Sequence, residues 1–255
     1  MTFLGHSAYV EAKAYEKATS SMVSEMSVEN LAEFQLKEFA ETLSLGFYKN
    51  SKKENLKKAN NIRKKHKKRS LKYTIYFMFP LLAILGSYFL LSIRAFTFFA
   101  SLSSMLTLFF GLIIPIMMVT IHKNVEYLGD VVLSFESKGV IGSISKLFDN
   151  GDIVVASVIL LFSVLIPSVK IISLLFVSLF IQSKFAHGIV KFFKVIGKWS
   201  MADVFVVATF LVYLTVDKGD VSRAEVEVGL YFFLAYVISS MLVSLSADRM
   251  LAHRN

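Results

Sequence analysis

Long apolar runs constrain the fold of this chain more than any other feature of its sequence. Five such runs occupy Tyr73–Ile93, Phe96–Ile121, Ile153–Ser183, Ser200–Val216 and Val228–Leu245. A helix needs about 20 predominantly apolar residues to cross the hydrocarbon core of a bilayer. Together with a hydrophobic content of 55% and a mean hydropathy of +0.59, the runs predict an all-α, polytopic helical membrane protein, since soluble domains have a lower apolar fraction.

The runs divide the chain into three parts. Residues 96–255 are expected to form a four-helix transmembrane bundle, and residues 73–95 an extra N-terminal hydrophobic segment. Residues 1–72 precede them as an amphipathic and polybasic arm, expected in the cytoplasm. Apolar residues recur at helical spacing from Val28, which predicts an amphipathic helix that ends near Gly46.

The arm carries a dense cluster of positive charge. Twelve of the 28 Lys and Arg residues lie between Lys49 and Lys72, directly before the first apolar run. Basic clusters beside a membrane segment attract anionic lipid headgroups, with about 1 kcal/mol per charge near the surface. Nucleic acid is not expected as a partner, because the cluster has no interleaved aromatic residues. The residues expected to bind headgroups are Lys64, Lys65, Lys67, Lys68 and Arg69.

Charge bias gives conflicting orientations for the arm. Lys and Arg flank membrane spans on the cytoplasmic side, which puts both the basic cluster and the basic loop at 184–198 inside. If that loop is inside, the segment 122–152 is outside, and a full span at 73–93 would put the cluster outside too. Either 73–93 enters the membrane without crossing it, or the cluster lies on the side that the charge bias disfavours.

Two ionisable residues lie inside apolar runs. Lys170 is near the middle of Ile153–Ser183, three residues after Pro167, and Asp203 lies just inside the next run. An ionised group at membrane depth costs at least about 2.5 kcal/mol on insertion scales, so such residues are usually paired and functional. Opposite charges on consecutive spans predict a buried pair. Ser163 lies two helical turns from Lys170, on the same face.

Several motifs resemble those of a known family. The run Gly197-Lys198-Trp199-Ser200-Met201-Ala202-Asp203-Val204-Phe205 resembles the signature of the paraquat-inducible protein A family of bacterial inner-membrane proteins. Supporting similarity lies at Gly151-Asp152, Phe162 to Lys170, Leu112 to Met117, Ser240-Met241 and Asp248-Arg249, so that the resemblance covers roughly residues 97–250. It implies an intramembrane polar network of Ser163, Lys170, Asp203 and Ser240, with Pro167, Gly197, Trp199 and Ser200 as supporting motif residues. Ser240 occupies a place where the family usually has threonine.

The absence of cysteine departs from the family pattern. Family members often carry a Cys-rich zinc ribbon before the membrane domain, whereas this chain has no cysteine. Disulfides, thiol chemistry and Cys-ligated metal sites are therefore excluded. No cofactor or metal is expected, because the five histidines are scattered without metal-ligand spacing. An enzyme is not expected either, since neither a P-loop nor a nucleophile–base pair appears.

The resemblance also implies a function. Family members are inner-membrane components of lipid-trafficking systems and work with proteins that carry mammalian-cell-entry domains. This chain would then be a multi-pass protein of the bacterial inner membrane that moves phospholipid between that membrane and an envelope carrier. The polar network would act in a proton relay or in conformational coupling, or else as a structural ion pair that fixes helix register. A non-transporting scaffold and a small-solute or proton-coupled exporter stay open as alternative functions.

Overall fold

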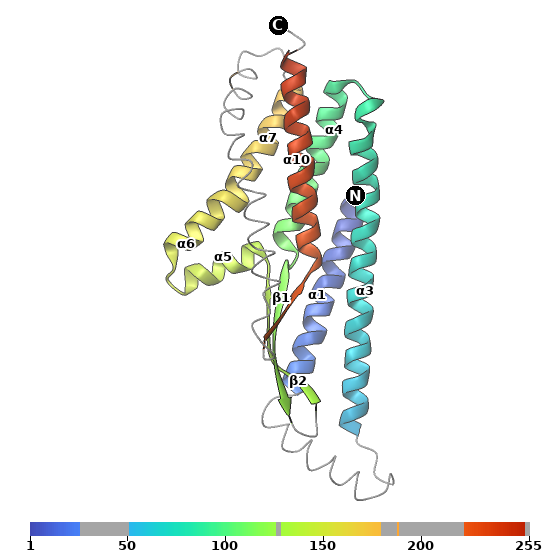
Figure 1. The fold of residues 1–255 in the computed structure, drawn as a ribbon, viewed down its shortest axis with the longest axis vertical. Helices are drawn as coiled ribbons and strands as arrows, with labels where there is room; N and C mark the ends of the chain where they lie inside the picture. The colour runs from blue at the N-terminus through green and yellow to red at the C-terminus, as the bar shows by residue number, and fades with distance from the viewer. Residues whose placement is uncertain (26–50, 126–128, 180–187, 189–221, 253–255) are drawn as a thin grey trace, which may run out of the picture.

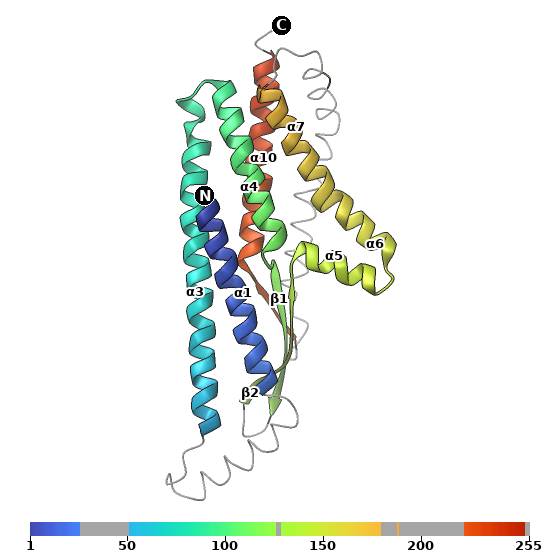
Figure 2. The same cartoon turned by 180° about the vertical axis from the view of Figure 1, so that it is seen from behind.

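The computed structural model describes residues 1–25, 51–125, 129–179, 188 and 222–252, and it shows an elongated helical protein with a small sheet (Figures 1 and 2). In chain order the elements are α1 (Thr2–Glu25), α3 (Ser51–Gly86), the 3-10 turn η1 (Ser87–Phe89), α4 (Ile93–Ile113), β1 (Met117–Val125), β2 (Gly129–Lys138), α5 (Val140–Asp149), α6 (Ile153–Ile159), the π-helical turn η2 (Leu160–Leu165), α7 (Ile166–Leu179), β3 (Ser222–Val226) and α10 (Val228–Ala252).

The helices confirm the expected polytopic membrane fold. Within the described residues, four helical stretches are long and apolar enough to cross a membrane: Lys58–Phe89, Ile93–Ile113, Ile153–Leu179 and Val228–Arg249. The predicted span at 200–216 and the predicted amphipathic helix at 28–46 both lie outside the described residues.

Glycines allow α4 and α10 to pack closely. A Cβ on Gly111 of α4 would lie 2.9 Å from the backbone nitrogen of Phe233. Small residues at helix crossings in membranes permit such an approach. Ile171 of α7 packs against the same pair, and the three helices share one apolar core of Leu108, Leu112, Ile116, Ile171, Leu230, Phe233, Tyr236 and Val237.

We expect Gly229→Ala to lower the free energy of unfolding by about 1–3 kcal/mol, the usual cost of overpacking. A Cβ at Gly229 would lie 2.4 Å from the carbonyl oxygen of Ile114 and 2.5 Å from that of Pro115, and backbone atoms cannot move aside as a flexible side chain can. Gly142→Ala in α5 is the control, because a Cβ there meets nothing within 4 Å. Thermal unfolding in detergent measures both variants, and equal stability would contradict the close approach.

A three-stranded antiparallel sheet of order β2-β1-β3 lies beyond one end of the bundle (Figure 1). Met117 at the start of β1 pairs with Lys138 of β2 and Val226 of β3. The prediction that Phe96–Ile121 forms one span is therefore wrong at its C-terminal end. Pro115 disfavours a helical conformation at the residue before it, and Ile114 is indeed extended, with φ −71° and ψ 140°.

The sequence did not predict α1, which packs antiparallel to α3 (Figures 1 and 2). In α1 every third or fourth residue faces α3, as in a coiled-coil seam. The buried residues are Ala8, Ala12, Tyr15, Thr19 and Met22 on α1 and Ser70, Thr74, Phe77 and Leu81 on α3.

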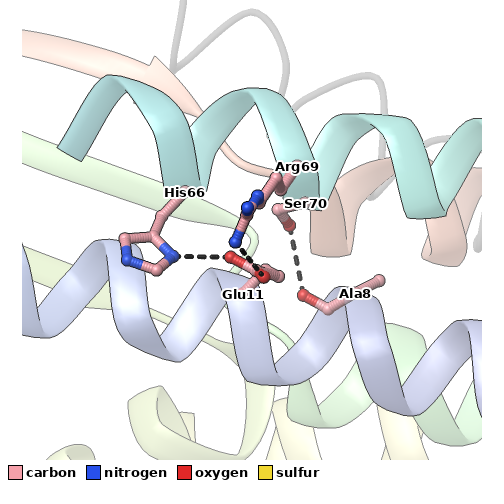
Figure 3. Close-up of polar contacts among 5 residues, drawn as sticks. All are labelled: Ala8, Glu11, His66, Arg69 and Ser70. Carbon is pink, nitrogen blue, oxygen red and sulfur yellow. Dashed lines mark hydrogen bonds and ion pairs between the residues drawn. The ribbon is translucent and has the colours of Figure 1, made fainter. Parts of the chain in front are cut away.

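Polar contacts fix the register of α1 on α3 (Figure 3). His66 Nδ1 and Arg69 Nη1 lie 2.5 Å and 3.6 Å from the two carboxylate oxygens of Glu11. One turn further along, Ser70 Oγ donates to the carbonyl oxygen of Ala8 at 3.1 Å. We call α1 and α3 together the hairpin; both apolar and polar residues set how these two helices pair.

The hairpin lies at the same end of the bundle as the sheet. Tyr15 Oη donates to Glu225 Oε2 of β3 at 3.2 Å. At the opposite end of the bundle, Arg94 at the start of α4 donates to the carbonyl oxygens of Ser178 and Leu179, where α7 ends. The basic arm therefore shares one side with the strands at 117–138, and the end of α7 that leads toward 184–198 lies on the other.

This placement favours the second of the two alternatives for the arm. Charge bias alone would put the basic cluster inside and the segment 122–152 outside. In the structure α3 runs unbroken from Ser51 to Gly86, and its basic half lies on the same side of the bundle as the strands of that segment. If the loop at 184–198 follows its charge bias, the basic cluster lies on the side that its own charge disfavours. Which side is cytoplasmic stays a prediction.

Candidate functional site

Lys170 lies on the face of α7 that packs against α4 and α10. The buried residues of this face are Pro167, Lys170, Ile171, Leu174, Val177 and Ser178. Only 6% of Lys170 is exposed. Lys170 lies near the middle of the apolar run Ile153–Ser183, which is long enough to cross a hydrocarbon core about 30 Å thick. The predicted intramembrane cation is therefore buried inside the bundle.

The helix that carries Lys170 is irregular just before it. In η2 the backbone widens, and the N–H of Ile166 donates to the carbonyl oxygen of Leu161, five residues earlier. Pro167 follows at once and supplies no backbone donor. Single π-helical turns occur often at functional sites. Ser163 lies within this turn and is half-buried. Two residues predicted for the site, Ser163 and Pro167, therefore lie in or just after the same irregular part of the helix.

Hydroxyl groups connect α4, α10 and α7. Ser104 Oγ of α4 donates to Ser239 Oγ of α10 at 2.8 Å, and Ser239 Oγ donates to the carbonyl oxygen of Tyr236 at 3.0 Å. Tyr236 Oη in turn reaches the carbonyl oxygen of Pro167 at 3.5 Å. We call Ser104, Ser239, Tyr236 and Pro167 the hydroxyl chain. These contacts link three spans by polar groups, although the aromatic ring of Tyr236 separates its carbonyl oxygen, which accepts from Ser239, from its Oη, which donates to Pro167.

The hydroxyl chain places Lys170 and Ser240 at one level. Lys170 follows Pro167 by one helical turn, and Ser240 follows Tyr236 by one turn. Because α7 and α10 run in the same direction (Figure 1), both residues lie about one turn beyond the contact between Pro167 and Tyr236. Ser240 is 1% exposed, and its Oγ donates to the carbonyl oxygen of Val237 at 3.1 Å.

Only part of the predicted network lies within the described residues. Ser163 lies in η2, and Lys170 and Ser240 are buried on α7 and α10, whereas Asp203, Gly197, Trp199 and Ser200 lie outside the described residues, so a network among them stays a prediction. The hydrogen bond between Ser104 and Ser239 was not predicted. The sequence feature that could have indicated it is a group of hydroxyl residues inside an apolar stretch: Ser101, Ser103, Ser104 and Thr107. All four are buried on α4.

A second polar cluster joins the arm to the membrane domain, at the start of α10. Lys67 Nζ lies 2.5 Å from Glu225 Oε2. Burial would raise the pKa of Glu225, but the hydrogen bond and the charge of Lys67 outweigh it and hold the pKa below its ordinary value of 4.5. Burial and the carboxylate of Glu225 raise the pKa of Tyr15 well above its ordinary 10.0. The ion pair between arm and sheet is thus charged at neutral pH.

Glu227 is the buried member of this cluster. It precedes α10, is 5% exposed, and its Oε1 has no hydrogen-bond partner among the described residues. Burial raises the pKa of Glu227 to about 7; the carboxylates of Glu225 and Glu16 act in the same direction and the cations of Lys67 and Arg63 oppose them. Desolvation disfavours the charged form of such a group, so Glu227 changes charge near neutral pH.

The five predicted headgroup-binding residues differ in their surroundings. Lys64, Lys65, Lys68 and Arg69 are exposed. Arg69 Nη1 also lies 3.6 Å from Glu11 Oε1, and Lys67, which is half-buried, pairs with Glu225. Among the residues that the structure describes, no three His, Cys, Asp or Glu side chains are grouped so that they could hold a metal ion.

Comparison with known proteins gives one match. No curated protein and no solved structure matches the chain. A sequence model of the family described as "Paraquat-inducible protein A" matches residues 95–255, which is more than half of the chain. The matched part begins in α4 and contains Lys170, the hydroxyl chain and Glu227, whereas α1 and α3 precede it. The chain therefore belongs to the paraquat-inducible protein A family.

Proposed function

We propose that this multi-pass protein moves phospholipid between the bacterial inner membrane and an envelope carrier with mammalian-cell-entry domains. It has no enzymatic role in this proposal. Family membership supports the general function, and the observation that carries the mechanism is the buried amine of Lys170, near the middle of a span and one turn from the hydroxyl chain.

A phospholipid that leaves a bilayer must move a polar headgroup past apolar protein or lipid. An amine and several hydroxyls at mid-depth supply hydrogen-bond partners that an aliphatic helix lacks. The π-helical turn and Pro167 supply a place where the span can bend without losing many further backbone hydrogen bonds. In this proposal the network of Ser163, Lys170, Asp203 and Ser240 couples the bending of α7 to the passage of lipid.

The extramembrane side offers a surface for the carrier. The sheet and α5 lie on the same side of the bundle, and α5 projects sideways from it (Figures 1 and 2). In α5, Ile144 is buried while Ile141 and Phe148 are exposed, a pattern typical of a helix that lies at a membrane surface. A carrier that docks on this side would meet the protein where lipid leaves the membrane.

Lipid transfer from proteoliposomes tests this function. The purified protein is reconstituted with a fluorescent phospholipid, and a carrier with mammalian-cell-entry domains from the same cells is added as acceptor. We expect transfer above that of protein-free vesicles, and co-isolation of the carrier with the protein from native membranes. Transfer equal to protein-free vesicles would contradict the proposal, and uptake of a small solute in its place would support an exporter.

A further inference from the structure

The helix α3 has two different faces along its basic half. One face packs against α1 and the sheet, and it carries Arg63, His66, Lys67 and Ser70. The opposite face is exposed and carries Lys64, Lys65, Lys68 and Lys72, which we call the α3 ridge. The structure thus separates the cations that hold the arm in place from those that face outward.

The exposed face changes from cationic to apolar within one turn. After Lys72 it continues with Ile75, Tyr76, Phe79 and Leu82, of which Phe79 is 65% and Leu82 63% exposed. The Lys72 amine lies 5.5 Å from the centre of the Tyr76 ring, and amphipathic aromatic rings are enriched at the membrane–water boundary. The hydrocarbon core therefore begins close to Tyr73.

Helix geometry sets the distance of each cation from that boundary. Along the axis, Lys68 is about 6 Å and Lys64 about 12 Å from Lys72. The headgroup layer on each side of a bilayer is about 5–8 Å thick, and the electrostatic screening length at physiological ionic strength is about 8 Å. All four cations of the α3 ridge are therefore within the headgroup layer or within one screening length of it.

No acidic side chain of the same helix compensates this charge. After Glu54, α3 has no Asp or Glu, and the neighbouring carboxylates of Glu11 and Glu225 face the inner side, where they contact His66, Arg69 and Lys67. The charge of the α3 ridge is directed to the surroundings of the protein at headgroup level.

We propose that the α3 ridge binds the headgroups of anionic phospholipids in the leaflet on the side of the sheet. The occupant is a lipid surface rather than a protein or nucleic acid, because the ridge continues into a lipid-facing apolar surface on the same helix. This inference concerns the arm, which precedes the family match, and it does not depend on lipid transfer by the bundle.

The test measures which lipids surround the protein. The full chain is reconstituted into vesicles of equal parts phosphatidylglycerol and phosphatidylcholine, extracted with its nearest lipids in polymer-bounded discs, and the two lipids are quantified. The variant carries Lys64→Gln, Lys65→Gln, Lys68→Gln and Lys72→Gln. The control carries four equal changes at Lys52, Lys53, Lys57 and Lys58, which lie on the same helix about 20–30 Å from Lys72.

We expect enrichment of phosphatidylglycerol around the native protein and around the control, and its loss in the α3 ridge variant. Each juxtamembrane charge changes the preference about five-fold at low salt, and added salt should reduce the enrichment of the native protein. Equal loss in the variant and the control would show an effect of net charge alone and overturn the proposal. Enrichment retained in the α3 ridge variant would overturn it as well.

Discussion

Lys170→Met is expected to abolish lipid transfer while the protein still accumulates in the membrane. Methionine matches the length of the lysine stem but cannot donate a hydrogen bond or carry charge. The loss of a buried cation also removes its desolvation cost, and a carboxyl group that loses its cation in apolar surroundings can take up a proton. The bundle should therefore remain folded although the network no longer works.

The measurement is transfer of fluorescent phospholipid from proteoliposomes, with the protein amount determined in the same vesicles. Lys13→Met is the matched control, because Lys13 has 51% of its side chain exposed and, within the described part of the chain, pairs with Glu16 one turn away. Such surface pairs contribute about 0–1 kcal/mol. The control should transfer lipid as the native protein does. Full transfer by both Lys170→Met and Lys170→Ala would contradict a role of the amine.

Glu227→Gln is expected to raise the free energy of unfolding by about 3 kcal/mol above pH 7. The pKa of Glu227 is about 7 in the folded protein and 4.5 ordinarily. Between these values the folded state binds one more proton than the unfolded state, so the stability of the native protein falls as the pH rises from about 4.5 to 7. Glutamine cannot ionise and avoids this loss, and its advantage should disappear toward pH 4.5.

Glu225→Gln is the matched control with the opposite sign. The pKa of Glu225 is lowered from 4.5 by Lys67, so its charge stabilises the folded state above about pH 4.5, and this contribution is lost only as the pH falls below that value. Glu225→Gln should therefore destabilise the protein at pH 5 and pH 8 alike, whereas Glu227→Gln stabilises it only at the higher pH. Unfolding in mixed micelles at about pH 5 and pH 8 compares the two variants. Destabilisation by Glu227→Gln at pH 8 would contradict this prediction. It would mean that partners other than Tyr15, Arg63 and Lys67 stabilise the buried carboxylate.

The spans could be predicted because their signal is local. Apolar length alone located α4, α10 and the helical stretch from Ile153 to Leu179. Apolar length gave a wrong helix end where an apolar β-strand directly follows a membrane helix. Met117–Ile121 continues the hydrophobic run of α4, and hydropathy cannot distinguish a buried strand from a helix end. Pro115 was the signal for the change.

The contacts of the arm could not be predicted, because they join residues far apart in the chain. Lys67 and Glu225 are separated by 158 positions, and a run of lysines does not show which member turns inward. In α1, the seam of Ala8, Ala12 and Tyr15 is too weakly apolar to stand out from a polar segment. The burial of Glu227 likewise depends on α1 and α3, which lie before the family match.

Site residues could be predicted from the sequence where a side chain is unusual for the residues around it. A lysine in an apolar run predicts burial with a partner, and Lys170 is buried. Serines are ordinary in membrane helices, so the hydrogen bond between Ser104 and Ser239 needed the structure. The level shared by Lys170 and Ser240 needed it too, since it follows from the contact between Pro167 and Tyr236.

Lipid transfer by the double variant Lys170→Met with Asp203→Leu tests the role of the intramembrane charges most directly. Removing both charges leaves no unpaired ion, so the bundle should fold at least as stably as the native protein. If the charges couple the shape of the bundle to the passage of lipid, the double variant is stable and transfers no more lipid than protein-free vesicles. Native transfer by this stable double variant would mean that the charges only fix helix register, and it would contradict the proposed mechanism.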